Sequence, residues 1–303
     1  MASFGGQTLV EPLRRVLVRS PRSADLARWQ AFGWLGEPDA ALAAKQHNDL
    51  CEILRSADVT VELAEVAIER DPDAIYVFDP SIVSDTGAVV LRPGKEGRLR
   101  ESAAAAAEMR RLGVPVAFEM SPPATAEGGD TMWLDEQTLV VGRSFRTNDA
   151  GVDALRLALP GVDVVAFDVP NQQGPEVCLH LMSLVSPLDR DLVVAYVPLL
   201  PVRLVELLEA RGIEIVHVPD DEFETMGPNV LALAPRVALA LDGNPQTRRR
   251  MERAGVDVFV YDGSEISLKG EGGPTCLTRP LLRASPARSP LISRVRRTER
   301  REA

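Results

Sequence analysis

The chain has 303 residues and a formal net charge of -10, and 45% of its residues are hydrophobic. This acidic balance excludes a general affinity for nucleic acid, and no run of about 18 or more uncharged apolar residues is present that would span a bilayer. We therefore expect a globular protein without nucleic-acid or membrane partners.

The beginning of the chain, MASFGGQTLVEPLRRVLVRSP, lacks the continuous apolar segment of an export signal, so we expect a cytoplasmic location. Three cysteines (Cys51, Cys178 and Cys276) form no CxxC pattern, and the three histidines show no metal-ligand spacing. We expect neither disulfides nor a metal, and we assign Cys51 and Cys178 to packing.

A seven-residue segment with alternating β-branched residues, typical of a strand, recurs along the chain, and we call it the recurring phrase. The copies are ADVTVEL (57–63), GVPVAFE (113–119), GVDVVAF (161–167), GIEIVHV (212–218) and GVDVFVY (255–261). Four of them follow a helical stretch that ends at the phrase's own glycine, which is a common helix terminator.

Before each of the last four helices, two short strands flank a polar turn. These pairs are PSIVSDTGAVVLRPG, DTMWLDEQTLVVGRS, LMSLVSPLDRDLVVAYVP and NVLALAPRVALALDG. The unit strand, strand, helix, strand thus repeats about every 45 to 50 residues, which favours an α/β propeller of five units in one domain, residues 1–283. The alternative is an open doubly wound α/β sheet. The remainder, 284–303, is basic and poor in apolar residues, and we expect it to be disordered.

Polar residues stand where apolar strands stop, and in a ring of units these positions would converge on the axis. They are Asp73, Asp79, Arg98, Glu127, Asp130, Arg146, His180 and Cys276. Cys276 lies in EGGPTCLTRP, where two glycines and a proline indicate a shaped loop that presents a thiol; the alternative is a small buried hydrophobe.

These residue types point to nucleophilic catalysis. Cys276 supplies a nucleophile, His180 a proton shuttle and Glu127 a carboxylate. Each residue alone also has a structural interpretation: a core histidine, a turn carboxylate, a solvated arginine. Acidic and basic residues together favour a substrate that carries both a cation and a carboxylate.

The chain resembles the guanidino-group-modifying enzymes, also called the amidinotransferase or pentein superfamily, and within them the dimethylarginine dimethylaminohydrolases. The resemblance covers the chain from about Val16 to Leu282. It rests on PDxxxxxD (72–79), LRPGKEGRLRE (91–101), EGGD (127–130), VGRSFRTNDAG (141–151), LHL (179–181) and GGPTCLTRP (272–280).

The resemblance implies a five-bladed α/β propeller and a covalent hydrolysis without a cofactor. Cys276 would attack the guanidinium carbon, His180 would protonate the departing amine and then activate water, and Glu127 would orient His180 and hold the guanidinium. The other residues would bind a small guanidino amino acid: Asp79 at the guanidinium nitrogens, Arg98 and Arg146 at the α-carboxylate, Asp73 at the α-amino group, and Asp130 as a further substrate-binding residue.

Two departures from the family pattern concern the substrate. Met182 stands where arginine deiminases carry an aspartate, and a thioether favours packing against methyl groups over binding an unsubstituted guanidinium. Phe78 replaces a glutamate that dimethylarginine hydrolases usually carry, which predicts the loss of a polar contact with the substrate and favours a different guanidino compound. The two departures thus point in opposite directions, and hydrolysis of N-methylated arginine to citrulline and an amine is the leading hypothesis.

Other functions stay open at this point. They are an arginine deiminase or dihydrolase, an amidinotransferase, and a catalytically silent binding protein, which the presence of Cys276 and His180 disfavours. The segment RWQAFGWLGEPDAA (28–41) has the composition of a glycine-hinged lid, and an assembly of identical copies also remains open.

Overall fold

The computed structural model describes residues 3–172, 174, 177 and 179–284. The predicted disordered segment 284–303 lies outside the described residues apart from Ala284, and so does Cys178. Among the described residues no helix is long and apolar enough to cross a membrane.

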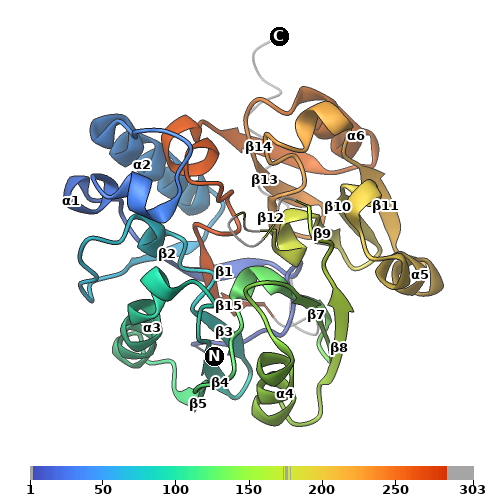
Figure 1. The fold of residues 1–303 in the computed structure, drawn as a ribbon. Helices are drawn as coiled ribbons and strands as arrows, with labels where there is room; N and C mark the ends of the chain where they lie inside the picture. Colours follow the sequence, from blue (N-terminus) through green and yellow to red (C-terminus); the bar gives the residue numbers. More distant parts are fainter. Residues whose placement is uncertain (1–2, 173, 175–176, 178, 285–303) are drawn as a thin grey trace.

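The described residues form five three-stranded sheets, ordered β15-β1-β2, β3-β4-β5, β6-β7-β8, β9-β10-β11 and β12-β13-β14 (Figure 1). The strands are β1 (Leu13–Val18), β2 (Thr60–Leu63), β3 (Ser81–Ser84), β4 (Gly87–Val90), β5 (Val116–Glu119), β6 (Thr131–Asp135), β7 (Thr138–Arg143), β8 (Asp163–Asp168), β9 (Val185–Asp189), β10 (Leu192–Ala195), β11 (Glu214–His217), β12 (Val230–Ala234), β13 (Val237–Leu241), β14 (Asp257–Tyr261) and β15 (Arg279–Arg283). All five recurring phrases are strands, as predicted.

Every sheet has the same internal plan. Its middle strand pairs antiparallel with one neighbour and parallel with the other, as β4 does with β3 and β5. A parallel pair needs a crossover, and a helix supplies it in each sheet. The helices are α2 (Ala40–Ser56), α3 (Arg100–Arg111), α4 (Asp149–Ala158), α5 (Val202–Ala210) and α6 (Pro245–Arg253), with a short α1 (Ser23–Leu26) near the beginning of the chain.

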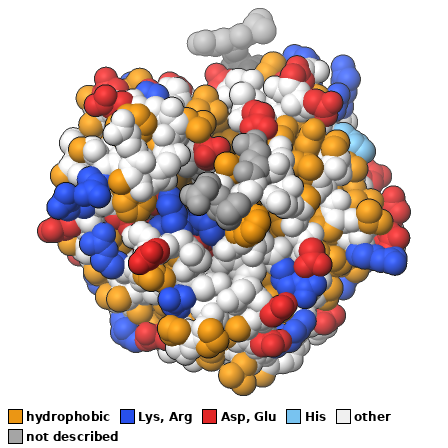
Figure 2. All heavy atoms as spheres, in the orientation of Figure 1, with side chains coloured by type: hydrophobic (Ala, Val, Ile, Leu, Met, Phe, Trp, Pro, Cys, Tyr) orange, Lys and Arg blue, Asp and Glu red, His pale blue; other side chains and the backbone are white. Residues whose placement is uncertain are grey.

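The first sheet joins the two ends of the described chain. The sequence predicted strand pairs for only four units, and the fifth pair is made of β1 and the distant β15, which lie antiparallel. The repeat of five units is therefore confirmed, and its first sheet is completed by the residues that follow Cys276. In Figure 1 the helices lie toward the outside, whereas β1, β12 and β15 lie near the middle. Around the rim of the face in Figure 2, acidic and basic side chains are interspersed.

Helix α4 shows how the units are held together. Its apolar side chains Val152 and Leu155 are buried in the largest hydrophobic cluster of the described residues, together with Leu139 of β7 and Leu204 of α5. Leu155 is 0% exposed, whereas Leu157 on the same helix is 75% exposed.

This contrast yields a stability test. Leu155→Ala should lower the free energy of unfolding by about 2–5 kcal/mol, because it opens a cavity in a close-packed core. Leu157→Ala makes the same chemical change on the solvent side and should change the free energy by less than about 0.5 kcal/mol. Urea unfolding followed by circular dichroism measures both. Equal losses for the two variants would contradict the packing described.

Candidate active site

Each of the five sheets has a polar residue shortly before its first antiparallel strand. Asp79 precedes β3, Glu127 precedes β6, His180 precedes β9, Asn229 precedes β12 and Cys276 precedes β15. Four of these five were predicted from the sequence as site residues. The equivalent position in each repeat thus supplies one polar group.

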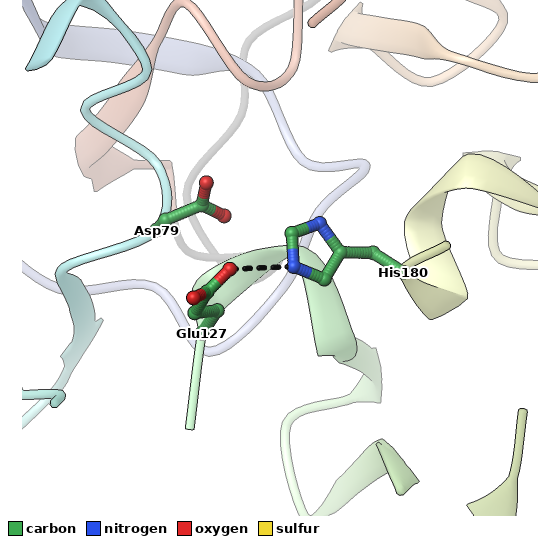
Figure 3. A group of neighbouring side chains, drawn as sticks. All are labelled: Asp79, Glu127 and His180. Atoms are coloured by element: carbon green, nitrogen blue, oxygen red, sulfur yellow. Dashed lines mark hydrogen bonds and ion pairs between the residues drawn. The ribbon is translucent and has the colours of Figure 1, made fainter. Parts of the chain in front are cut away.

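Glu127 and His180 form the central contact. His180 Nε2 lies 2.7 Å from Glu127 Oε2, and the Glu127 side chain is fully buried (Figure 3). The backbone of Gly129 passes so close to the imidazole that a Cβ there would lie 2.4 Å from His180 Nδ1, which explains a glycine in the EGGD motif. The ring is thereby held in one orientation against the carboxylate.

An arginine and a backbone N–H group also approach Glu127. Arg146 Nη1 lies 3.1 Å from Oε1 and 3.2 Å from Oε2, and the backbone N–H of Gly94 donates to Oε1 at 2.9 Å. Burial alone would raise the pKa of Glu127, but the hydrogen bond with His180 and the charges of His180, Arg146 and Arg98 outweigh it and hold the pKa well below its usual value. The carboxylate therefore stays ionised.

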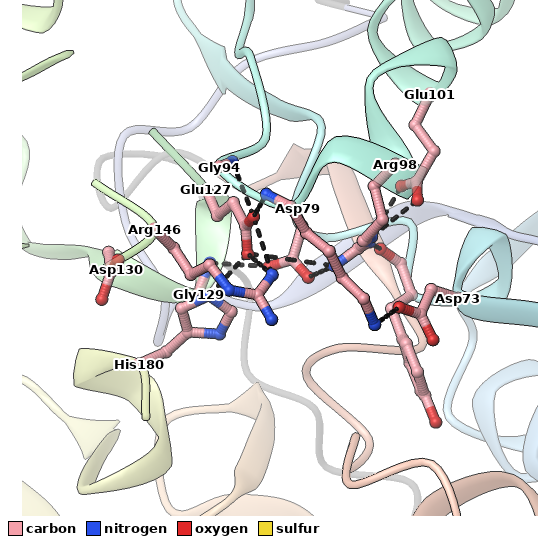
Figure 4. A network of polar contacts seen from close by, with 12 residues as sticks. Asp73, Asp79, Gly94, Arg98, Glu101, Glu127, Gly129, Asp130, Arg146 and His180 are labelled. Atoms are coloured by element: carbon pink, nitrogen blue, oxygen red, sulfur yellow. Dashed lines mark hydrogen bonds and ion pairs between the residues drawn. The ribbon is translucent and has the colours of Figure 1, made fainter. Parts of the chain in front are cut away.

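Arg98 has partners that the sequence did not predict. Its Nη1 lies 2.7 Å from Asp79 Oδ2, and its Nε and Nη2 donate to the two oxygens of Glu101 at 2.6 and 2.8 Å (Figure 4). The residue is 3% exposed. Asp79 Oδ1 accepts from the backbone N–H of Gly129 at 2.9 Å. Arg98 thus fixes Asp79, and the expected contact with an α-carboxylate stays a prediction.

Asp130 connects two loops of the site. Its Oδ2 accepts from the hydroxyls of Ser144 and Thr147 at 2.6 and 2.7 Å, and its Oδ1 accepts from the backbone N–H of Leu181 at 3.0 Å. The carboxyl is fully buried. These contacts secure the residues next to Arg146 and His180, so the geometry gives Asp130 a supporting place at the site.

Asp73 lies under the segment predicted to be a lid. The indole N–H of Trp34 donates to Oδ1 at 2.8 Å. Lys95 Nζ lies 2.6 Å from Oδ2, and Figure 4 shows Asp73 in this ion pair. Trp34 is buried, whereas its neighbour Leu35 is 71% exposed. The segment therefore lies on the site, with one side chain inserted and the next in solvent.

Cys276 is partly buried, and its sulfur is approached by the side chain of Asn229 and the backbone of Gly273. Asn229 Nδ2 lies 3.4 Å from Cys276 Sγ, while Asn229 Oδ1 accepts from the backbone N–H of Thr275 at 3.2 Å. A Cβ on Gly273 would lie 2.5 Å from Asn229 Oδ1, so the glycine lets the loop reach this amide. Burial raises the pKa of the Cys276 thiol to about 11, and the negative charge of Asp79 adds to the effect. The amide and His180 act in the opposite direction.

Asn229 is the site residue that sequence reasoning missed. It is the first residue of NVLALAPRVALALDG, directly before the first strand of its unit. The other four units carry their polar residue at the equivalent place. Alignment of the five units with one another would have identified it.

Phe78 and Met182 are both buried in the largest hydrophobic cluster of the described residues, at 1% and 2% exposure. The guanidinium of Arg279 stacks on the Phe78 ring, 3.8 Å from its centroid. Both side chains contribute to the core, and their expected effects on the choice of substrate stay predictions. Cys51 is buried next to His47, in agreement with a packing role.

One group of described residues has the spacing of metal ligands. Single ligand atoms of Asp79, Glu127 and His180 all lie within 4.8 Å of one another. The same groups already bind each other or an arginine, and the charges of Arg98 and Arg146 oppose a divalent cation there. The absence of a metal stays a prediction.

A family model described as "N,N dimethylarginine dimethylhydrolase, eukaryotic" matches residues 37–283. The chain belongs to this family. Its members are hydrolases that act on guanidino groups, and the predicted membership of the pentein superfamily is confirmed.

Curated relatives agree with this assignment. The chain is 27% identical over 265 residues to the N(G),N(G)-dimethylarginine dimethylaminohydrolase of Pseudomonas aeruginosa, covering 88% of this chain and 98% of that protein. It is 29% identical over 314 residues to the arginine deiminase of Mycobacterium tuberculosis, covering 90% and 75%.

Solved structures share the fold. A cysteine-to-serine mutant of the Pseudomonas aeruginosa hydrolase, complexed with citrulline, superposes with a TM-score of 0.75 at 25% identity and covers 88% of this chain and 99% of its own. The N-terminal domain of ArgZ, a cyanobacterial arginine dihydrolase, superposes with a TM-score of 0.76 at 20% identity and covers 89% and 97%.

The contact between Asn229 and the sulfur yields a prediction about the thiol. Asn229→Ala should raise the pKa of Cys276 further and slow its alkylation by iodoacetamide at pH 8 about 3- to 10-fold, because a lost hydrogen bond is worth roughly 1 kcal/mol. Asn229→Asp should slow the reaction further, because a carboxylate opposes the thiolate. Mass spectrometry of the Cys276 peptide in the ligand-free protein follows the rate.

The matched control is Asn48→Ala, which removes an exposed asparagine from α2. It should react like the unaltered protein. If Asn229→Ala alkylates at the control rate over the whole pH range, the amide does not stabilise the thiolate.

Proposed function

We propose that the chain hydrolyses a small substituted guanidino compound, N-methylated arginine first among them, through a covalent intermediate on Cys276. The observation that carries the proposal is the contact of His180 with a buried, ionised Glu127 beside Asp79, with a thiol that responds electrostatically to both Asp79 and His180. This is a nucleophile, a proton shuttle and a cation site in one place.

The reaction proceeds in two steps. Cys276 gives its proton to His180 as its Sγ attacks the guanidinium carbon, and His180 passes that proton to the departing amine, so that a thiouronium forms on the enzyme. His180 then takes one proton from water, which attacks the same carbon. The second proton of that water goes to the departing sulfur, the ureido product and the Cys276 thiol are released, and His180 gives its proton to solvent. Glu127 stabilises the protonated imidazole in both steps, because it lies 2.7 Å from Nε2.

The two site carboxylates Asp79 and Glu127 bind the guanidinium, since a delocalised planar cation matches carboxylate oxygens. Arg146, which borders Glu127, binds the substrate carboxylate. Arg98 and Asp130 act at a distance by holding Asp79 and the loops of the site. Asp73 faces the end of the substrate opposite the guanidinium.

Because the pKa of Cys276 is raised, we assign part of the activation of its thiol to the bound substrate. A thiol with a pKa of about 11 is protonated at neutral pH in the empty site. A bound guanidinium cation next to the sulfur favours the thiolate. The nucleophile thus becomes reactive when the correct charge is present.

We also propose that the five sheets close into a propeller. In support, the first sheet joins β1 to β15 from the other end of the chain, and polar groups from all five units meet at the site. A closed ring removes the exposed strand edges that an open array would leave at its ends.

Arginine itself is the second candidate substrate. Several curated relatives are arginine deiminases at 28% to 29% identity. Phe78, which stands in place of a glutamate usual in dimethylarginine hydrolases, keeps arginine open as a substrate, whereas Met182 favours the methylated compound. The same residues would perform the same steps on either guanidinium.

A substrate panel tests the reaction. Purified protein incubated with asymmetric dimethylarginine, monomethylarginine or arginine should release citrulline and an amine from at least one of them. Cys276→Ser should lower the rate by about 10³-fold or more, because it removes the nucleophile. Citrulline and released amine are both quantified. Turnover that survives in Cys276→Ser, or transfer of the amidino group to an added amine, would contradict the hydrolytic mechanism.

The segment 28–41 yields a second test, because we propose that it is a lid. Chymotrypsin should cut after the exposed Leu35 more slowly when a guanidino ligand occupies the Cys276→Ser protein, since a ligand beneath Trp34 stabilises the closed segment. Gel electrophoresis with mass identification follows the cut. Equal rates with and without ligand would contradict the lid.

A further inference from the structure

Asp73, expected at the substrate's α-amino group, already has a cation of this chain beside it. Lys95 Nζ lies 2.6 Å from its Oδ2, and Trp34 Nε1 donates to its Oδ1 at 2.8 Å. The side-chain exposure of Asp73 is 7%. The negative charge that would attract an ammonium group is therefore largely neutralised.

Lys95 is held in this place by several contacts. Its Nζ also donates to the backbone carbonyl of Phe32 at 2.6 Å and lies 5.1 Å from the centroid of the Phe32 ring. Its backbone N–H lies 3.4 Å from Glu127 Oε1. The lysine is thus fixed between the lid segment, Asp73 and the central carboxylate.

A second ammonium bound to Asp73 would lie next to Lys95, and like charges at such a distance repel each other strongly where water is scarce. A carboxylate would be attracted instead. A lysine ammonium has three N–H donors, of which Asp73 and Phe32 take two, and the Lys95 side chain is 26% exposed. One donor therefore remains for a substrate oxygen.

We propose that Lys95 determines substrate choice at the far end of the site, so that the enzyme prefers an ω-guanidino acid without an α-amino group to the corresponding amino acid. The inference rests on the proposed guanidino hydrolysis. N-methylated arginine, the first candidate among the guanidino amino acids, is then a weaker substrate than the same compound without its amino group. The preferred class is a guanidinium at one end of an alkyl chain and a carboxylate at the other.

Binding of a matched pair of ligands tests the proposal. Arginine and 5-guanidinopentanoate differ only in the α-amino group. Calorimetry on Cys276→Ser protein, in which no thiouronium forms, should give a dissociation constant about tenfold or more lower for 5-guanidinopentanoate. Lys95→Met, which keeps the length of the side chain and removes its charge, should abolish this preference or reverse it.

Two controls make the result specific. Lys95→Arg keeps the charge and should keep the preference. Lys45→Met removes an equal charge from an exposed ion pair with Asp49 on α2, and it should leave the ratio of the two dissociation constants unchanged. Circular dichroism checks that each variant is folded. If Lys95→Met does not fold, the ratio of the two dissociation constants is still measured for the parent protein and for Lys95→Arg, and it shows whether 5-guanidinopentanoate is preferred.

The outcomes separate the two proposals. Tighter binding of arginine, or a ratio that Lys95→Met does not change, would overturn the role of Lys95 even if the enzyme hydrolyses guanidino compounds. Tighter binding of 5-guanidinopentanoate that depends on Lys95, without turnover of any guanidino compound by the unaltered enzyme, would overturn only the proposed reaction. Absence of binding of either ligand would overturn both.

Discussion

The ionised carboxylate of Glu127 is the feature on which the site depends. A fully buried charge is costly unless donors surround it, and here His180, Arg146 and the backbone of Gly94 do so. Each donor comes from a different loop, so the charge holds several loops at fixed positions. Removal of any one donor would leave a buried charge undercompensated, which makes the loops interdependent. Glu127 thus holds the loops in place and also supplies the negative charge beside His180.

The five-unit repeat explains why such distant residues meet. Each unit is a short antiparallel pair, a helix and a parallel strand, and the residue before the first strand of the pair points to the site in every unit. One strand pair is shared by the two ends of the chain, β1 and β15, and Cys276 lies just before the second of them. Pairing of these two strands therefore positions Cys276, the proposed nucleophile, at the site.

Local patterns predicted much of the fold, and contacts between distant residues account for what was missed. Strands such as β5 and β14 follow from alternation, because side-chain direction in a strand depends on neighbours in sequence. The partners of Arg98 depend on how a buried guanidinium is satisfied by Asp79 and Glu101, which no spacing reveals. Phe78, beside Asp79, was interpreted from the sequence as the loss of a polar contact with the substrate. Its ring is buried in the core against the guanidinium of Arg279, a contact between distant residues that no local pattern reveals.

The charges of the site also explain why the Cys276 thiol is a weak nucleophile in the ligand-free protein. Asp79 and burial together keep the Cys276 thiol protonated, although Asn229 and His180 favour the thiolate. In the proposed reaction, the same Asp79 that opposes the thiolate attracts a guanidinium, and the bound cation favours the thiolate at the sulfur. A neutral molecule of the same shape would leave the thiol protonated. On this proposal the charge of the substrate is selected before its shape, and the proposed role of Lys95 extends selection by charge to the other end of the site.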